Sequence, residues 1–566
     1  MAPRTEGGAS KRRRAGGRSF GPACAWWACA PWARALGARA LCACVAMAGA
    51  CSGCEGDRAH ATGEGLSGAD SGPAASAGTA SPGGTGTLAG VGTDRDPGRG
   101  PPLADAAART EVGHVPGALG ALTAPALPPR VPDAERPSAK LKPPKGAAAA
   151  PWKRLFDTYG KLVDLDPILD DFHREHPKQT EIVTLGATHE GRALKALLIA
   201  DTPSLARGRP AMLLNGAHHG DEPLSAMIVL DAIEALLAGA GKDPKIDRYL
   251  SELAVWCVPL VNRDGFAHFW VDFGAGRKNG RPSERPATAP FASWGVDLNR
   301  NYPFRWGAHG EVGSSKTPER RSYRGPEPGS EPETRAIMAL SEREHFVGSI
   351  SYHIGTVALL APYTIDGVLQ PEPNEAWLVA EHVARAIPSV PMFGSRAVPV
   401  RKNLYTVDGT DQDHLRHAHG TLALLFESAA RSWENPDLAR RAVEAIRPSW
   451  GALFDRYLDG PSVEGHVRDE AGRPVSARVE VVEVKTHAGE DWRSRCSDGF
   501  FGRYLPGTGT FTVRVTPGEG PAVEKTVEVT EGKGRAAIDF VVPASDGASG
   551  CGEAGESEKP AKDAAN

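Results

Sequence analysis

The chain has 566 residues, which is long enough for two or more domains with sizeable hydrophobic cores. Its formal net charge of -4 and its pI near 6.5 show no basic excess, so nucleic acid is excluded as an expected partner. The sequence contains 66 glycines and 47 prolines, and much of this excess lies before residue 151. Because such a composition cannot bury enough apolar surface to offset chain entropy, we expect residues 55–150 to form a disordered tether.

Residues 1–54 have the organisation of an export segment. Basic residues 11–14 precede the apolar residues 40–50, a run that is too short to span a bilayer. The sequence that ends in Cys51 resembles a bacterial lipoprotein cleavage site, and Cys44 is a second candidate for acylation. A mis-chosen start codon or a weak twin-arginine signal would also explain the long basic region. We therefore expect an exported protein, either secreted or attached to the cell-envelope membrane by a lipid on Cys51.

Six of the nine cysteines lie in this export segment, and the remaining three do not make a disulfide framework. Cys257 lies in an apolar run and is expected to be a small buried hydrophobe. Cys496 is expected to be inert.

The first predicted elements are a helix that begins at Asp166 and ends before Pro177, and a hairpin over residues 180–199. Strands are then predicted over residues 211–216, 254–261, 347–353 and 421–427, and helices over residues 223–237, from about residue 330, and over residues 436–458. This alternation predicts an α/β domain over residues 151–460, with a mixed, mostly parallel sheet covered by helices on both faces.

The pattern changes between residues 461 and 545, where short β-rich runs are separated by Gly, Pro and Asp turns. The runs cover residues 479–484, 500–505, 510–516, 523–529 and 537–542. They predict a small all-β antiparallel sandwich. Residues 546–566 are polar and are expected to form a disordered tail.

Residues with metal-binding or acid/base chemistry follow three of the predicted strands. His219 and Glu222 lie three residues apart just after residues 211–216, so one turn of backbone can direct both side chains at one ion. His353 ends another strand, and Glu427 ends an apolar strand, where a carboxylate is costly to bury unless it is paired or used. A surface turn would also explain the His-x-x-Glu spacing by itself. Because an open α/β sheet places its active site at the carboxyl ends of its strands, we predict that these residues converge.

Six segments of the chain, in order, carry a resemblance to a known family. They are Gly216-Ala-His-His-Gly-Asp-Glu-Pro223, Val261-Asn-Arg-Asp-Gly265, Gly295-Val-Asp-Leu-Asn-Arg-Asn-Tyr302, residues 323–334, the strand ending in His353, and residues 405–427. Together they resemble the zinc-dependent metallocarboxypeptidases of the carboxypeptidase A, T and E type, over about residues 160–458. The segment around residues 469–475 also resembles the transthyretin-like domain that follows the catalytic domain in the carboxypeptidase E and N branch.

The resemblance implies one zinc ion per catalytic domain, bound by His219, Glu222 and His353. It also implies that Glu427 is the general base for the zinc-activated water. This agrees with the chemistry, because zinc lowers the pKa of water while a neighbouring carboxylate takes the proton and passes it to the leaving amine. The expected substrates are the C-termini of peptides or proteins.

The resemblance further implies residues that hold the substrate. Asn299 and Arg300 fall where the family binds the terminal carboxylate, a task suited to a planar guanidinium group. Tyr405 falls where a mobile tyrosine covers the bound substrate. An arginine should stabilise the oxyanion, and Arg281 is the first choice with Arg277 as the alternative.

The specificity for the last residue of the substrate stays open. Gln412 lies where the digestive branch sets specificity, and a neutral amide there argues against a simple basic-residue pocket. In the carboxypeptidase E branch an acid soon after the third zinc ligand selects Lys or Arg, and this chain has Thr364 and then Asp366 near that place. Broad, apolar and basic specificities all remain possible.

Other histidines are given simpler interpretations. His218 is expected to support the ligands or to face solvent, without binding the metal. His414, His417 and His419 are expected to lie on an exposed helical or loop face, without forming a second metal site.

Two further functions are kept as alternatives. A peptidoglycan-peptide hydrolase of the γ-D-glutamyl-diamino-acid type would use the same metal site, whereas a deacylase of the aspartoacylase kind would not need Tyr405. A catalytically inactive peptide-binding homologue is the alternative outside enzymes, but such a relative is expected to lose a zinc ligand or the base. We expect the protein to be a monomer.

Overall fold

The computed structural model describes residues 166–271, 275–282, 295–388, 397–429, 436–530 and 532–543. The expected export segment with Cys51, the tether and the C-terminal tail lie outside the described residues. In the described part no single helix is long and apolar enough to cross a membrane. Helices α4 (Pro223–Gly239) and α5 (Pro244–Glu252), which are bent by 107°, pass that test only as a pair.

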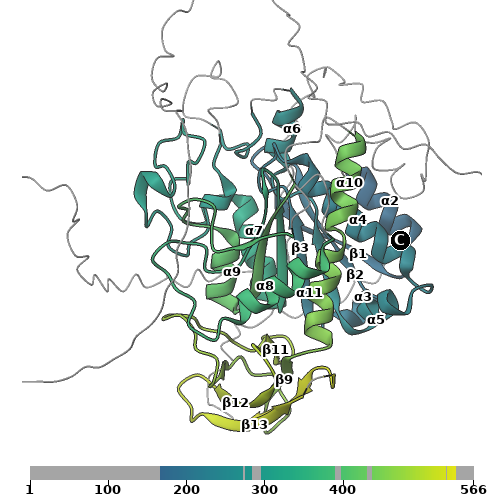
Figure 1. The fold of residues 1–566 in the computed structure, drawn as a ribbon, viewed down its shortest axis with the longest axis vertical. Coiled ribbons are helices and arrows are strands. Elements are labelled where there is room, and N and C mark those ends of the chain that lie inside the picture. Colours follow the sequence, from purple (N-terminus) through teal and green to yellow (C-terminus); the bar gives the residue numbers. More distant parts are fainter. Residues whose placement is uncertain are drawn as a thin grey trace, which may run out of the picture. The chain divides into compact units, whose positions relative to one another are not determined.

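An eight-stranded mixed sheet organises the larger part of the described chain (Figure 1). Its order is β1-β2-β4-β3-β5-β8-β6-β7, and its four central strands, β4, β3, β5 and β8, run parallel. The strands cover Thr180–Ala187 (β1), Ala193–Ile199 (β2), Ala211–Gly216 (β3), Ala254–Val258 (β4), Gly348–His353 (β5), Val357–Leu360 (β6), Val400–Arg401 (β7) and Leu422–Ser428 (β8).

The central strands are buried between the covering helices, and apolar residues predominate in β3, β4 and β8, whereas β5 carries Ser349, Ser351 and His353 on one face. β3, β4 and β5 are buried along their whole length, and β8 is buried except at Glu427. The sequence prediction of a mixed, mostly parallel sheet is confirmed at the centre. The edges differ, because β1, β2 and β6 pair antiparallel with their neighbours towards the centre of the sheet.

Helices cover both faces of the sheet (Figure 1). One hydrophobic cluster joins the sheet to α2 (Asp166–Glu175), α4, α5, α8 (Glu375–Ala386), α10 (Pro436–Ile446) and α11 (Pro448–Leu458). A second cluster joins the other face to α7 (Pro332–Glu344) and α9 (Asp411–His419). The shorter α3 (Pro203–Ala206) and α6 (Arg263–Val271) complete the helices of this part. The predicted two-sided cover is therefore present.

The predicted last helix is two helices in the structure. α10 ends at Ile446 and α11 starts at Pro448, because proline lacks the N–H that would continue the hydrogen bonds of a helix. α5, α6 and α8 were not predicted from the sequence.

The C-terminal β region packs two small sheets around one core. One sheet is β10 (Arg478–Val481), β12 (Gly509–Thr516) and β13 (Val523–Val529), all antiparallel. The other contains β9 (Ser462–Asp469) and β11 (Phe500–Tyr504), which are antiparallel, and two short strands, β14 (Ala536–Ala537) and β15 (Phe540–Val542). β14 and β15 run parallel to β9, which corrects the prediction of a purely antiparallel sandwich.

This β region is joined to the α/β part by buried polar contacts. The Arg495 guanidinium donates to the carbonyls of Arg209 at 3.2 Å and Glu344 at 3.1 Å. The Tyr363 hydroxyl, from the α/β part, donates to Glu490 at 2.5 Å. Such contacts tie the two parts together because each buried group would be unsatisfied without its partner.

The two cysteines that fall in the described part behave differently. Cys257 is buried and free, as expected, and burial raises the pKa of its thiol. Cys496 is disulfide-bonded, a state that was not predicted from the sequence.

Candidate active site

The three predicted metal ligands meet at the carboxyl ends of two adjacent strands. His219 and Glu222 lie in the turn after β3, and His353 is the last residue of β5, which pairs parallel with β3. His219 Nδ1 is 3.0 Å from Glu222 Oε1 and 3.2 Å from His353 Nδ1, and His353 Nδ1 is 3.2 Å from Glu222 Oε2. All three side chains are buried, and their ligand atoms lie within 4.8 Å of one another. Two imidazole nitrogens and a carboxylate that converge in this way fit a zinc ion.

The turn that carries His219 and Glu222 is held close to the start of α6. A Cβ on Gly220 would lie 2.1 Å from the backbone nitrogen of Phe266, so no larger residue fits there. The Glu222 backbone N–H donates to the His219 carbonyl, which closes the turn between the two ligands. Ala217 adopts a left-handed conformation with φ of 54°, which is unusual for a residue other than glycine and redirects the chain at the strand end.

A buried carboxylate orients the first ligand. Asp297 Oδ1 lies 3.0 Å from His219 Nε2. Burial would raise the pKa of Asp297, but the positive charge of Arg277 and then that of His219 hold this pKa well below its ordinary value. Because an ionised carboxylate can only accept, His219 donates through Nε2–H and keeps the Nδ1 lone pair for the metal. Sequence analysis included Asp297 in a family motif but assigned it no role.

Glu222 is prepared for a cation in a similar way. Its Oε2 accepts a hydrogen bond of 3.0 Å from the backbone N–H of Ile354. Burial would raise the pKa of Glu222, but the neighbouring His219 and His353 hold it well below its ordinary value. The carboxylate is therefore ionised, as a metal ligand must be.

Glu427 lies beside the three ligands. It is paired with His353 in the register of β5 and β8, and both residues line one cavity. Its Oε2 is buried and has no hydrogen-bond partner in the part of the chain that the structure describes. Burial, followed by the negative charge of Glu222, raises the pKa of Glu427. An unpartnered carboxylate with a raised pKa is suited to accept and return a proton.

The structure separates the two candidate arginines. Arg277 contacts Asp297 through Nε at 2.9 Å and Nη2 at 2.8 Å, and its Nη1 lies 3.4 Å from His219 Nδ1. Arg281 instead donates to Glu331 at 2.9 Å, and its side chain is 35% exposed. The buried charge of Asp297 therefore holds Arg277 beside the metal ligands, whereas Glu331 holds Arg281.

Asn299, Arg300 and Tyr405 line the same cavity as two of the metal ligands, His219 and His353. The Asn299 side-chain oxygen accepts from the backbone N–H of Asp411 at 2.9 Å, and Arg300 donates to the Asn299 carbonyl at 2.6 Å. The Tyr405 hydroxyl lies 3.4 Å from Arg300 Nη2, although Tyr405 is 56% exposed. A buried guanidinium below an exposed phenol forms a positively charged site at the mouth of this cavity.

The rest of the cavity lining combines apolar and polar side chains. Leu360, Val407 and Leu425 are apolar, and Thr364, Asn403 and Gln412 are polar. Gln412 comes from the first turn of α9, so the structure brings it to the cavity that holds the metal ligands.

The remaining histidines are more buried than the sequence indicated. His218 is fully buried and lies 2.9 Å from the Tyr302 hydroxyl, so it supports the site and does not face solvent. Burial lowers the pKa of His218 to about 4. His414 and His419 are buried, and His417 stacks on Phe304 with ring centroids 4.3 Å apart. The expectation of an exposed face is therefore wrong, because α9 packs against the sheet.

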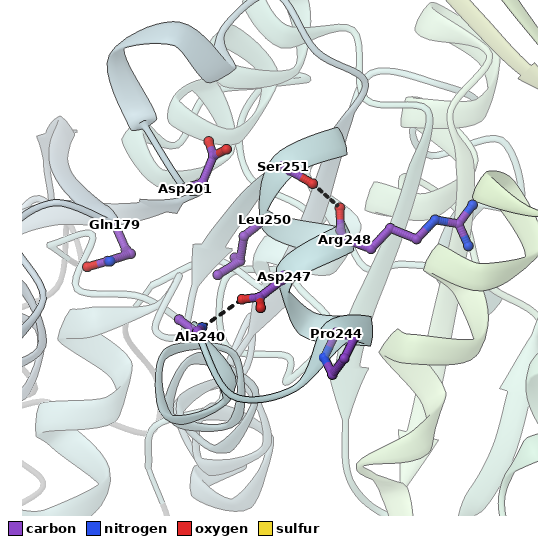
Figure 2. A pocket seen from close by; sticks show the side chains of 9 residues that line it. Gln179, Asp201, Ala240, Pro244, Asp247, Arg248, Leu250 and Ser251 are labelled. Atoms are coloured by element: carbon purple, nitrogen blue, oxygen red, sulfur yellow. Dashed lines mark hydrogen bonds between the residues drawn. The ribbon is translucent and has the colours of Figure 1, made fainter.

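A second cavity is lined by none of the predicted site residues (Figure 2). It lies beside α5 and includes Gln179, Asp201 and Asp247. Asp247 accepts from the backbone N–H of Gly241 at 2.7 Å, and Figure 2 shows Arg248 pointing away from the hollow. No arrangement for chemistry is visible there among the described residues.

The comparisons with known proteins agree with this site. Residues 165–436, a little under half of the chain, match the family model described as zinc carboxypeptidase. A metallocarboxypeptidase A of Trichophyton tonsurans is 28% identical over 273 residues, which cover 47% of this chain and 63% of that relative. Zinc carboxypeptidase A 1 of Anopheles gambiae is 32% identical over 235 residues, which cover 41% of this chain and 51% of that relative. The chain thus spans less than two thirds of the length of these curated relatives.

Among solved structures, carboxypeptidase A from Helicoverpa armigera is similar at 23% sequence identity and a TM-score of 0.44. The similarity covers 51% of this chain and 70% of that one.

Proposed function

We propose that this chain, whose residues 165–436 form a zinc carboxypeptidase domain, is a metallocarboxypeptidase that removes the last residue from peptides or proteins. One observation carries the proposal. A single cavity is lined by two of the three metal ligands, His219 and His353, by Glu427, whose Oε2 has no hydrogen-bond partner among the described residues, and by the buried Arg300. Hydrolysis needs the metal site and the carboxylate, and recognition of a free C-terminus needs the arginine.

Zinc fits the site because both imidazoles and the ionised carboxylate offer it ligand atoms at one place. When bound, zinc acidifies a water molecule and polarises the carbonyl of the peptide bond. His219, Glu222 and His353 would hold the ion.

The protein's own residues would carry the proton transfers. Glu427 takes a proton from the attacking water and passes it to the nitrogen of the leaving residue, so that the peptide C–N bond breaks. Burial and the negative charge of Glu222 raise the pKa of Glu427, and a raised pKa favours uptake of the proton from water.

Two arginines would divide the negative charges of the reaction. We assign Arg277, in place of Arg281, to the oxyanion that forms on the scissile carbonyl, because Arg277 lies beside His219. Arg300 and Asn299 would bind the terminal carboxylate of the substrate, and Tyr405 would cover it.

The proposal is tested with pairs of peptides that differ only in a free or an amidated C-terminus. We expect zinc-dependent release of the last residue from the free acid only. Glu427→Gln should bind zinc as the wild type does but lose on the order of 10²- to 10⁴-fold in kcat. Hydrolysis of both peptides, or full activity in Glu427→Gln, would refute the proposal.

Neither alternative function gains support. An inactive homologue would lack a ligand or the base, whereas this chain brings His219, Glu222 and His353 together and has Glu427 beside them. No described residue specifically favours a γ-D-glutamyl-diamino-acid substrate over an ordinary peptide. A muropeptide assayed beside the peptide pair separates the two enzyme functions.

We also propose the finer features that the sequence indicates. Residues 461–545 would be a transthyretin-like domain, supported by two small sheets that share one core. The chain would be an exported monomer with a lipid on Cys51, supported by the pattern of residues 1–54. Mass spectrometry of the mature N-terminus in the wild type and Cys51→Ser tests the lipid, and sedimentation equilibrium tests the monomer.

A further inference from the structure

Gln412 is one of the polar side chains that line the active-site cavity. It belongs to the first turn of α9, lines the same cavity as His219 and Glu427, and is only 2% exposed. A buried amide has two donor hydrogens on nitrogen and an acceptor oxygen, so the orientation of the amide decides which chemistry the cavity offers. Neighbouring hydrogen bonds fix that orientation.

The network starts at Asp413. Its carboxylate accepts the backbone N–H groups of Thr364 at 2.7 Å and Ile365 at 2.9 Å. It also lies 2.9 Å from the Thr364 hydroxyl. Burial raises the pKa of Asp413 to about 6, so the carboxylate is ionised at pH 8 and can only accept. The Thr364 hydroxyl therefore gives its one hydrogen to Asp413.

The orientation of Gln412 follows. Gln412 Nε2 lies 2.8 Å from the Thr364 hydroxyl oxygen. Because that oxygen has no hydrogen left to donate, it must accept, and only the NH2 end of the amide can face it. The contact with Thr364 uses one of the two Nε2 hydrogens, and the acceptor of the amide, Gln412 Oε1, has no hydrogen-bond partner among the residues that the structure describes.

The other groups around the cavity do not supply the missing donor. Leu360, Val407 and Leu425 are apolar, and the Asn403 Nδ2 hydrogens go to the Thr364 carbonyl at 3.0 Å and to Asp366 at 2.8 Å. Thr410 does not supply it either, because no hydrogen bond joins its hydroxyl to Gln412 Oε1. A buried acceptor without a partner is unfavourable, and a ligand that donates to it removes that cost.

We propose that this cavity selects a C-terminal residue whose side chain ends in a hydrogen-bond donor, as in glutamine or lysine, which donates to Gln412 Oε1. This rests on the proposed carboxypeptidase function and names its substrate class. A side chain of similar length that ends in a methyl group leaves Oε1 unpaired. A side chain that ends in a carboxylate cannot donate to Oε1, and the negative charge of Asp413 repels it.

The test uses four peptides that differ only in a last residue of Gln, Lys, Met or Glu, assayed at pH 8. We expect kcat/KM for Gln and Lys to exceed that for Met and Glu on the order of 10- to 100-fold. Gln412→Leu should abolish the advantage of Gln over Met.

A second pair of variants examines the network itself. Thr364→Val removes the hydroxyl that orients the amide, so Gln412 is free to turn and the ratio of Gln to Glu should fall towards one. Thr364→Ser keeps the hydroxyl and should keep the ratio. Melting temperatures report whether each variant is folded, and Gln412→Leu remains decisive if Thr364→Val is not.

The outcomes separate the two levels of the argument. If none of the four peptides loses its last residue, the proposed function fails. If all are cleaved with similar kcat/KM, or if Gln412→Leu keeps the wild-type ratios, the assignment of Gln412 is refuted while the function stands. The assignment of Gln412 is also refuted if kcat/KM is high for Lys but no higher for Gln than for Met. The cavity would then recognise positive charge and not a hydrogen-bond donor.

Discussion

Replacement of Asp297 by asparagine should weaken zinc binding through a residue that does not touch the metal. Asn has nearly the shape of Asp but no negative charge. The carboxylate of Asp297 currently faces His219 Nε2 at 3.0 Å and two nitrogens of Arg277 at 2.8 and 2.9 Å. In Asp297→Asn the Arg277 charge stays buried without its partner, and His219 is no longer held in the tautomer that leaves Nδ1 free.

The size of both effects can be worked from the structure. Breaking a buried ion pair by removing one charge costs about 3–5 kcal/mol, because the other charge remains desolvated. Loss of a carboxylate that orients a ligating histidine lowers metal affinity by about 10- to 100-fold. We therefore expect Asp297→Asn to show a lower melting temperature and a zinc dissociation constant that is larger by that factor.

The assay is competition for zinc with a chromogenic chelator, with thermal unfolding measured on the same samples. Asp231→Asn is the matched control. Asp231, on α4, is also buried, and its carboxylate oxygens accept hydrogen bonds of 2.7 and 2.8 Å from the Arg447 guanidinium. The control should lose stability but keep the zinc affinity. Wild-type zinc affinity in Asp297→Asn would refute the argument that Asp297 sets the state of His219.

Three further predictions concern stability and local geometry. Burial, followed by the charge of Asp264, raises the pKa of Glu333 to about 8, whereas an exposed glutamate titrates near 4.5. As the pH rises, the unfolded chain therefore loses this proton before the folded protein does. The free energy of unfolding, relative to that of Glu333→Gln, should fall between about pH 4.5 and pH 8 by at most about 1.4 kcal/mol per pH unit. Urea titrations that give both proteins the same dependence of this free energy on pH would contradict the prediction. Arg495→Ala should lower the free energy of unfolding by about 2–4 kcal/mol, because two buried carbonyls of the α/β part lose their donor. An unchanged midpoint of urea unfolding would show that this contact does not stabilise the protein. Gly220→Ala should abolish tight zinc binding, since the new Cβ would lie 2.1 Å from the Phe266 nitrogen, and zinc content by atomic absorption measures this.

The sequence alone determined what depends on short stretches of chain. The buried strands β3 and β8 appear as largely apolar runs and β5 as an alternating one, and each is followed or ended by a ligand or an acid, so the convergence of His219, His353 and Glu427 could be predicted. The parallel register then places those strand ends at one edge. The zinc carboxypeptidase resemblance rests on the order of these motifs along the chain, and residues 165–436 match the family model.

Only the tertiary structure decided which charged groups face one another. Arg277 and Arg281 are four residues apart in a polar loop, and nothing local distinguishes them. Their partners, Asp297 and Glu331, come from segments 20 and 50 residues further along the chain. The donor and acceptor pattern of Gln412 depends in the same way on Thr364, which is 48 residues away in the sequence. Pairing of buried charges and hydrogen bonds is set by distance in space, and the sequence does not specify that distance until the sheet has formed.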